Sequence, residues 1–170
     1  VPLIQIMDQT QTAMGARLLR RWLAFPLKDQ AQIEFRHQIV QDLVKDENLL
    51  QFIRSALSKI IDLERVVAKI ATEKISPRAL NQLEQALESL EALKQFLNEK
   101  GPASCKKQLK ILPDTQLIQR LLHKTLDPEA PVLVSKGKVI ASGFSEALDE
   151  LRNLRNTSQS RLDALLERET

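Results

Sequence analysis

Leucine recurs at helical spacing along residues 76–100, and this pattern constrains the fold more than any other feature of the chain. Ser76 and Pro77 mark its start, because a hydroxyl can cap the first turn and proline at the first helical position needs no amide partner. The stripe runs for about five turns, until Gly101 and Pro102 end it. Its near-heptad period is typical of helices packed against each other, although it is too short to require a coiled coil. The apolar positions are Leu80, Leu83, Leu87, Leu90, Leu93 and Leu97.

The composition extends this helical character to the whole chain. Of 170 residues, 43% are hydrophobic and 28% are charged, a balance typical of a globular protein with a real core. Only four glycines and no tyrosine occur, which favours an all-α fold of one domain. Cys105 is the only cysteine, so a disulfide framework is excluded. With no apolar run long enough for a membrane span and no signal peptide, we expect a cytoplasmic protein.

An amphipathic helix is predicted within Gln9–Leu27. Either Thr10 or Thr12 can cap it, and Pro26 ends it. We expect Trp22 to be a core anchor of this helix, packed with its neighbouring leucines against the other helices. The apolar side chains at helical spacing are Met14, Leu18, Leu19, Trp22 and Leu23.

A second helix is predicted from Asp29, because its carboxylate can accept from the amides of the first turn. Further helices are predicted to start near Asp46, at Asp62 and at Asp114. Residues 101–113 are rich in glycine, proline and lysine, and we expect them to form a surface loop.

The helical pattern breaks at residues 128–142. Two short apolar runs, 132–134 and 139–141, flank Ser-Lys-Gly-Lys, which predicts a small β-hairpin at about 132–141 with Gly137 in its turn. Ser145 then caps a final helix of about 25 residues, or about 37 Å. A helix longer than a domain of this size is expected to project as a strut. Its apolar seam comprises Leu148, Leu151, Leu154, Leu162 and Leu165. The expected division is therefore a helical body (1–127), a hairpin (128–144) and a long helix (145–170).

No segment of the sequence has the pattern of a catalytic site. Walker-type and dinucleotide-type glycine loops do not occur, and His37 and His123 have no further ligand at metal-binding spacing. Cys105 lies beside two lysines that could lower its pKa, but no histidine–acid partner accompanies it. We therefore expect structural roles for these side chains, and no catalytic, cofactor or metal site.

Three arginines are the remaining candidates for binding. Arg17 and Arg21 share a helical face, and Arg20 lies beside them. These side chains could meet DNA phosphates. The alternative, which we favour, is that they pair with acidic groups of neighbouring helices or adjoining domains. A net charge of +3, with both signs interspersed, gives little support to nucleic-acid binding on its own.

Four segments, in the same order, resemble the first half of the core or lever domain (domain III) of the MutS family of DNA mismatch-repair proteins, in its bacterial branch. Together they cover nearly the whole chain. The segments are Thr-Ala-Met-Gly with Leu-Leu-Arg-Arg-Trp-Leu in 12–23, Phe-Pro-Leu at 25–27 with Phe-Arg-His-Gln-Ile-Val at 35–40, Asp-Leu-Glu-Arg at 62–65 with Ser-Pro-Arg at 76–78, and 139–152.

The resemblance implies a non-catalytic lever that links a mismatch-binding and connector part and an ATPase to a DNA clamp, with 145–170 as the lever helix. It also implies a parent protein that binds mismatched double-stranded DNA, ATP and Mg²⁺, forms a homodimer, works with a MutL-type partner and acts in the bacterial cytoplasm at the nucleoid. The mismatch wedge, the clamp and the Walker loop match no position here. The chain's start at Val1 without methionine, and its end within a helical pattern, favour an excised domain.

Two other functions are compatible with the residues. A free-standing helical adaptor could offer a groove to a partner helix. A basic helical module could bind nucleic acid weakly and without specificity. A clamp and a Walker loop downstream in the parent reading frame would discriminate the lever from both.

Overall fold

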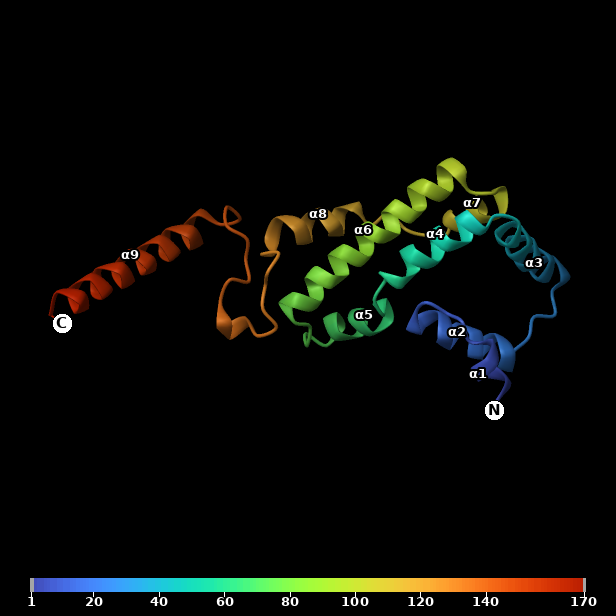
Figure 1. Cartoon of the computed structure of the whole chain (residues 1–170), viewed down its shortest axis with the longest axis horizontal. Helices are drawn as coiled ribbons and strands as arrows, with labels where there is room; N and C mark the ends of the chain where they lie inside the picture. Colours follow the sequence, from blue (N-terminus) through green and yellow to red (C-terminus); the bar gives the residue numbers. More distant parts are fainter. Residues whose placement is uncertain (1, 170) are drawn as a thin grey trace.

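The computed structural model describes the backbone of residues 2–169 and the side chains through Ser158. The described chain consists of α-helices, and a long connection that contains a 3₁₀ turn precedes the last helix (Figure 1). The all-α class predicted from the sequence is confirmed. The elements are α1 (Leu3–Met7), α2 (Ala13–Ala24), α3 (Gln30–Lys45), α4 (Glu47–Ser58), α5 (Leu63–Ala71), α6 (Pro77–Lys100), α7 (Ala103–Leu109), α8 (Gln116–Thr125), η1 (Val134–Lys136) and α9 (Glu146–Glu169).

Several helices begin where the sequence places a capping side chain. Of the two threonines before α2, Thr12 is the cap, since its hydroxyl accepts from the Gly15 amide at 3.0 Å. Ser76 caps α6 in the same way, with Pro77 in the first turn. The carboxylates that cap α3, α4 and α5 are those of Asp29, Asp46 and Asp62. Each cap satisfies an amide that would otherwise lack a partner.

Helix α6 is the central helix of the body. It packs against α4, α5, α7 and α8, and in Figure 1 it runs along the length of the body. The leucine stripe predicted from the sequence supplies the core side chains of α6. One buried cluster joins α6 to α5 and consists of Val66, Leu83 and Leu87. The other joins α6 to α4 and α7 and consists of Leu49, Leu93, Leu97 and Cys105.

The segment predicted as a surface loop contains a helix. Residues 103–109 form α7, which packs against α3 and α6, so the prediction of a loop is wrong there. Cys105 and Ser104 are both buried, and the Ser104 hydroxyl donates to the Asp42 carboxylate on α3 at 2.6 Å. Burial of one short apolar face outweighs the weak helical signal of a lysine-rich segment.

The predicted β-hairpin is also wrong, and no β-strand occurs within residues 2–169. The carbonyls of Leu133 and Val134 accept from the amides of Lys136 and Gly137, which closes the 3₁₀ turn η1. These carbonyls are therefore not available for a hairpin ladder. Ile140 forms an isolated antiparallel bridge with a different segment, at Leu126 after α8.

Trp22 does not lie in the core, contrary to the sequence prediction. Its side chain is 41% exposed, and none of the residues of α2 is buried. The indole ring instead lies under the Arg36 guanidinium of α3, with 3.7 Å from the guanidinium carbon to the ring centroid. The prediction fails because the body covers this face of α2 only in part, since Leu18 and Leu23 are also 46% and 44% exposed.

Helix α9 leaves the body after Ser145, as the sequence predicts, and extends away from the other helices (Figure 1). The Ser145 hydroxyl accepts from the Leu148 amide, which gives the expected cap. Leu151 and Leu154 of the predicted seam are 63% and 64% exposed. Two further members of the seam, Leu162 and Leu165, lie outside the described side chains.

Candidate functional site

Arg17 forms ion pairs with other residues of the described chain. Its guanidinium donates two hydrogen bonds to the Asp62 carboxylate, at 2.9 and 2.7 Å, and also bonds Glu64. This fork joins α2 to the start of α5, where Asp62 is also the cap. The hydrogen bonds from Arg17 lower the pKa of the Asp62 carboxyl, and those carboxylates raise the pKa of Arg17.

The other two predicted arginines are placed differently. Arg20 and Arg21 are exposed on α2. Neither has a hydrogen-bond or ion-pair partner among the side chains described through Ser158. The structure therefore does not bring the three arginines to one shared acceptor, and leaves Arg20 and Arg21 facing solvent.

The histidines and the cysteine do not form a site together. His37 is exposed on α3, and His123 of α8 is 80% exposed, with its Nδ1 2.9 Å from a Glu84 carboxylate oxygen. Burial raises the pKa of the Cys105 thiol, although its hydrogen bond with Ser104 partly opposes this shift. In the described part of the chain, no three His, Cys, Asp or Glu side chains gather that could hold a metal ion.

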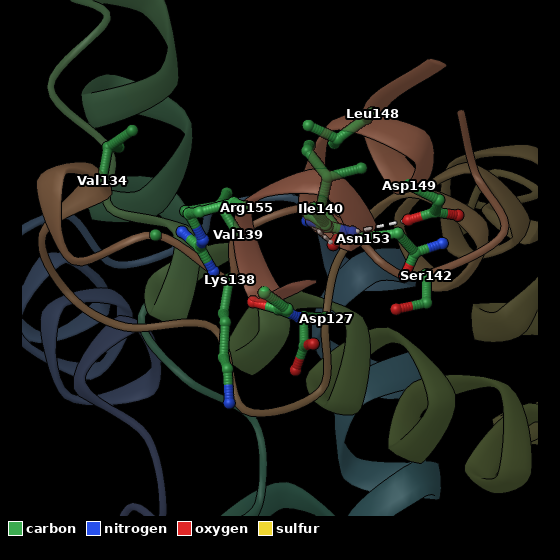
Figure 2. A pocket seen from close by; sticks show the side chains of 13 residues that line it. Asp127, Val134, Lys138, Val139, Ile140, Ser142, Leu148, Asp149, Asn153 and Arg155 are labelled. Carbon is green, nitrogen blue, oxygen red and sulfur yellow. Dashed lines mark hydrogen bonds and ion pairs between the residues drawn. The ribbon is translucent and has the colours of Figure 1, made fainter. Parts of the chain in front are cut away.

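A cavity of about 670 Å³, lined by both polar and apolar side chains, lies where the 127–142 loop meets the first turns of α9 (Figure 2). Its lining comes from the loop on one side and from α9 on the other. The lining residues are Asp127, Val134, Gly137, Lys138, Val139, Ile140, Ser142, Leu148, Asp149, Arg152, Asn153, Arg155 and Asn156. Polar side chains at its rim connect the two sides.

Two side chains of α9 make those connections. The Gly143 amide donates to the Asp149 carboxylate at 2.6 Å, and this bond is the main reason that the pKa of the Asp149 carboxyl is lowered. Arg152 donates to Asp149 at 3.0 Å and to the Ile140 carbonyl at 2.8 Å. Gly143 has a φ of +84°, a conformation that glycine adopts without strain, and this turn directs its amide at Asp149.

The loop is also fixed to the body from its other end. Asn81 of α6 is 8% exposed, and its amide group donates to the Asp127 carbonyl at 2.8 Å and to the Pro128 carbonyl at 3.0 Å. The Asn81 Oδ1 atom has no partner among the described residues. Polar contacts thus join the body, the loop and α9 at this junction.

Sequence reasoning did not identify Asn81, Asp149 or Arg152. A signal existed for the last two, since an acid and a base three residues apart in the first turns of a helix can pair. The hydrogen bond from Arg152 to the loop could not be predicted from the sequence, because it depends on how the backbone of residues 139–143 turns. These three side chains contain no nucleophile–base pair.

The fold is thus a helical body with one long projecting helix, which is the architecture of an all-α structural domain. Residues 2–169 match the protein family described as MutS domain III. The chain belongs to this family, which confirms the resemblance seen in its sequence motifs. Within residues 2–169, no helix has the length and apolar character needed to cross a membrane.

Curated relatives support the same assignment. The chain is 42% identical to the DNA mismatch repair protein MutS of Christiangramia forsetii, with all of this chain and 20% of that protein covered. It is 37% identical to the MutS of Flavobacterium johnsoniae, again with 100% and 20% covered. For the MutS of Cytophaga hutchinsonii the identity is 38%, over 99% of this chain and 20% of that protein. The chain thus spans about one fifth of the length of these relatives.

Proposed function

We propose that this chain is the lever-bearing part of a DNA mismatch-repair protein, in which it links a mismatch-binding and connector part and an ATPase to a DNA clamp. The observation that carries the proposal is α9: it leaves the body as a 24-residue helix with exposed leucines and is held at its base by polar contacts. A helix of 24 residues is about 36 Å long and stiff enough to carry a displacement over that distance.

The three parts of the chain have distinct roles in this proposal. The body (1–127) anchors the module, the loop (128–144) orients the helix, and the lever helix (145–170) transmits movement. Arg20 and Arg21 face outward and are proposed contacts for an adjoining domain or a DNA phosphate, whereas Arg17 is already neutralised by Asp62 and Glu64.

ATP and Mg²⁺ are proposed to act in another part of the parent protein. The described residues do not fit them, because no cluster of metal-ligating side chains and no glycine-rich phosphate loop is present. Mismatched double-stranded DNA, a second copy of the parent and a MutL-type partner are likewise proposed as partners of the parent, in the cytoplasm at the nucleoid. The chain itself is proposed to be non-catalytic.

A chimera tests the lever role. This chain would replace the matching segment of the Christiangramia forsetii MutS, and a flexible Gly-Gly-Ser-Gly insert would follow Thr157 within α9. We expect the insert to preserve ATP hydrolysis without DNA but to abolish the effect of mismatched DNA on it. The same insert after Lys110, in an exposed connection, is the matched control and should change neither. If the α9 insert left the response to mismatched DNA intact, the lever role would be rejected.

A further inference from the structure

In the part of α9 whose side chains are described, apolar burial is confined to the first turn, where Leu148 is half-buried and lines the cavity together with Ile140. Leu151 and Leu154, the apolar residues of its second and third turns, are 63% and 64% exposed. The cavity of about 670 Å³ is lined by this part of the helix and by the loop. A helix with one half-buried leucine at its base could still swing unless other contacts restrained it.

We propose that Asp149 and Arg152 are positioning residues that set the direction of α9. Arg152 ties the helix to the Ile140 carbonyl, Asp149 ties it to the Gly143 amide, and each side chain holds the other. The two backbone groups lie on the incoming loop, so the pair restrains the helix relative to the loop at two separate points. Figure 2 shows Asp149 beside Ile140 at this rim of the cavity.

The loop end of this restraint is itself fixed to the body by backbone hydrogen bonds. The Ala141 amide donates to the Thr125 carbonyl, and the Asp127 amide donates to the Val139 carbonyl, both at 2.9 Å. These bonds flank the antiparallel bridge between Leu126 and Ile140. Residues 139–141 are therefore held against the end of α8, which packs on α6.

Asn81 completes the connection to α6. Its amide group bonds the two carbonyls that follow the bridge, those of Asp127 and Pro128, and it is nearly fully buried. The polar contacts thus run without interruption from α6, through the loop, to Asp149 and Arg152 on α9. Contacts to ionised groups are stronger than neutral ones, which suits a restraint made from so few bonds.

The importance of this restraint rests on the proposed lever function, because a lever transmits movement only if its base does not pivot freely. The restraint itself, however, is a property of this chain alone. It can therefore be tested without the parent protein, and it can hold even if the lever function is rejected by the chimera.

Distance measurements by pulsed electron paramagnetic resonance test the proposal in the 170-residue chain. Spin labels at Gln95→Cys on α6 and Ser158→Cys on α9 report the direction of the helix, in a background where Cys105→Ala removes the native thiol. Arg152→Ala and Asp149→Ala should each cause loss of the single narrow distance peak and its replacement by a broad distribution. Arg155→Ala and Glu150→Ala remove the same charges from the same helix and should keep the narrow peak.

Circular dichroism distinguishes loss of direction from loss of structure. The proposal requires that Arg152→Ala and Asp149→Ala keep the helical signal and the thermal midpoint of the body while the distance distribution broadens. It is overturned if both variants retain the narrow peak, or if the two control variants broaden it equally. A variant that loses helical signal also counts against the proposal, because the residues would then maintain the fold and not the direction of α9.

Discussion

Individual polar side chains hold the ends of this molecule to its body. Arg17 connects α2 to α5 through Asp62 and Glu64, and Arg36 covers the indole of Trp22. None of these contacts is evident from apolar periodicity, which assigned Trp22 to the core because it recurs with leucines on one face. The periodicity correctly identified the helix, but which face meets the body depends on a partner 45 residues away in sequence.

The Arg17–Asp62 pair predicts a specific dependence on pH. The pKa of Asp62 is lowered in the folded chain, so its contribution is complete above its ordinary value of about 3.9 and is lost as the pH falls through the lower folded-state value. Arg17→Met should therefore lower the free energy of unfolding at pH 7. The difference in free energy between this variant and the unsubstituted chain should vanish only below about pH 3.9. Urea unfolding at a series of pH values measures it. An unchanged free energy at pH 7 would contradict the account, and Arg20→Met is the matched control.

Trp22→Ala should have a modest cost. A fully buried aromatic residue typically loses about 3–5 kcal/mol on truncation, whereas an exposed stack on a guanidinium contributes about 0.5–1 kcal/mol. We expect about 1 kcal/mol, because the side chain is 41% exposed. Denaturation followed by circular dichroism checks the value. A decrease of about 3 kcal/mol or more in the free energy of unfolding would contradict this account and would indicate that Trp22 is buried in a core.

At the scale of elements, local capping chemistry was predictable and packing between elements was not. Three helices start at the predicted residues, which are Asp46, Asp62 and Ser76. Such starts are predictable because a capping side chain acts on amides within one turn of its own position. The α7 segment was missed because its helix depends on burying Cys105 against α4 and α6. The false hairpin has the same origin, since Ile140 pairs with a residue at the end of α8 that local sequence does not reveal.

The junction between α6 and α7 should be sensitive to substitution of Gly101. A Cβ atom there would lie 2.4 Å from the Leu97 carbonyl oxygen, which is backbone and cannot move aside freely. Gly101→Ala should therefore destabilise the chain by about 1–3 kcal/mol, as overpacking commonly does. Thermal unfolding measures the change. Gly137→Ala is an informative comparison, because nothing lies within 4 Å of a Cβ there and only its φ of +73° opposes the change. An unchanged midpoint for Gly101→Ala would show that α7 can shift to make room.

At the scale of the whole molecule, the family was recognisable from four ordered motifs, whereas the junction was not. Each motif is a short run of consecutive residues, so it can be recognised without knowing the fold. Asn81 gave no such signal, because a lone asparagine in a leucine-rich helix has meaning only once the carbonyls of residues 127 and 128 are placed beside it.

The isolated chain should bind duplex DNA weakly, in a salt-sensitive manner and with no preference for a mismatch. Its 25 basic residues are nearly balanced by 22 acidic ones, so the net charge of +3 attracts the phosphate backbone only weakly. Trp22, which directly follows Arg21, already stacks under the Arg36 guanidinium and is therefore not free for base stacking. Fluorescence anisotropy with matched and mismatched duplexes checks this. Tighter binding to the mismatched duplex would contradict it.

The central claim is that α9 projects from a helical body and does not fold back on it. A compact chain of 170 residues has a radius of gyration of about 15 Å. Small-angle X-ray scattering, on a sample that light scattering identifies as one chain per particle, should give a clearly larger radius and a pair-distance distribution with a long tail. A radius of about 15 Å with a symmetric distribution would mean that α9 packs against its own body, and would contradict the account.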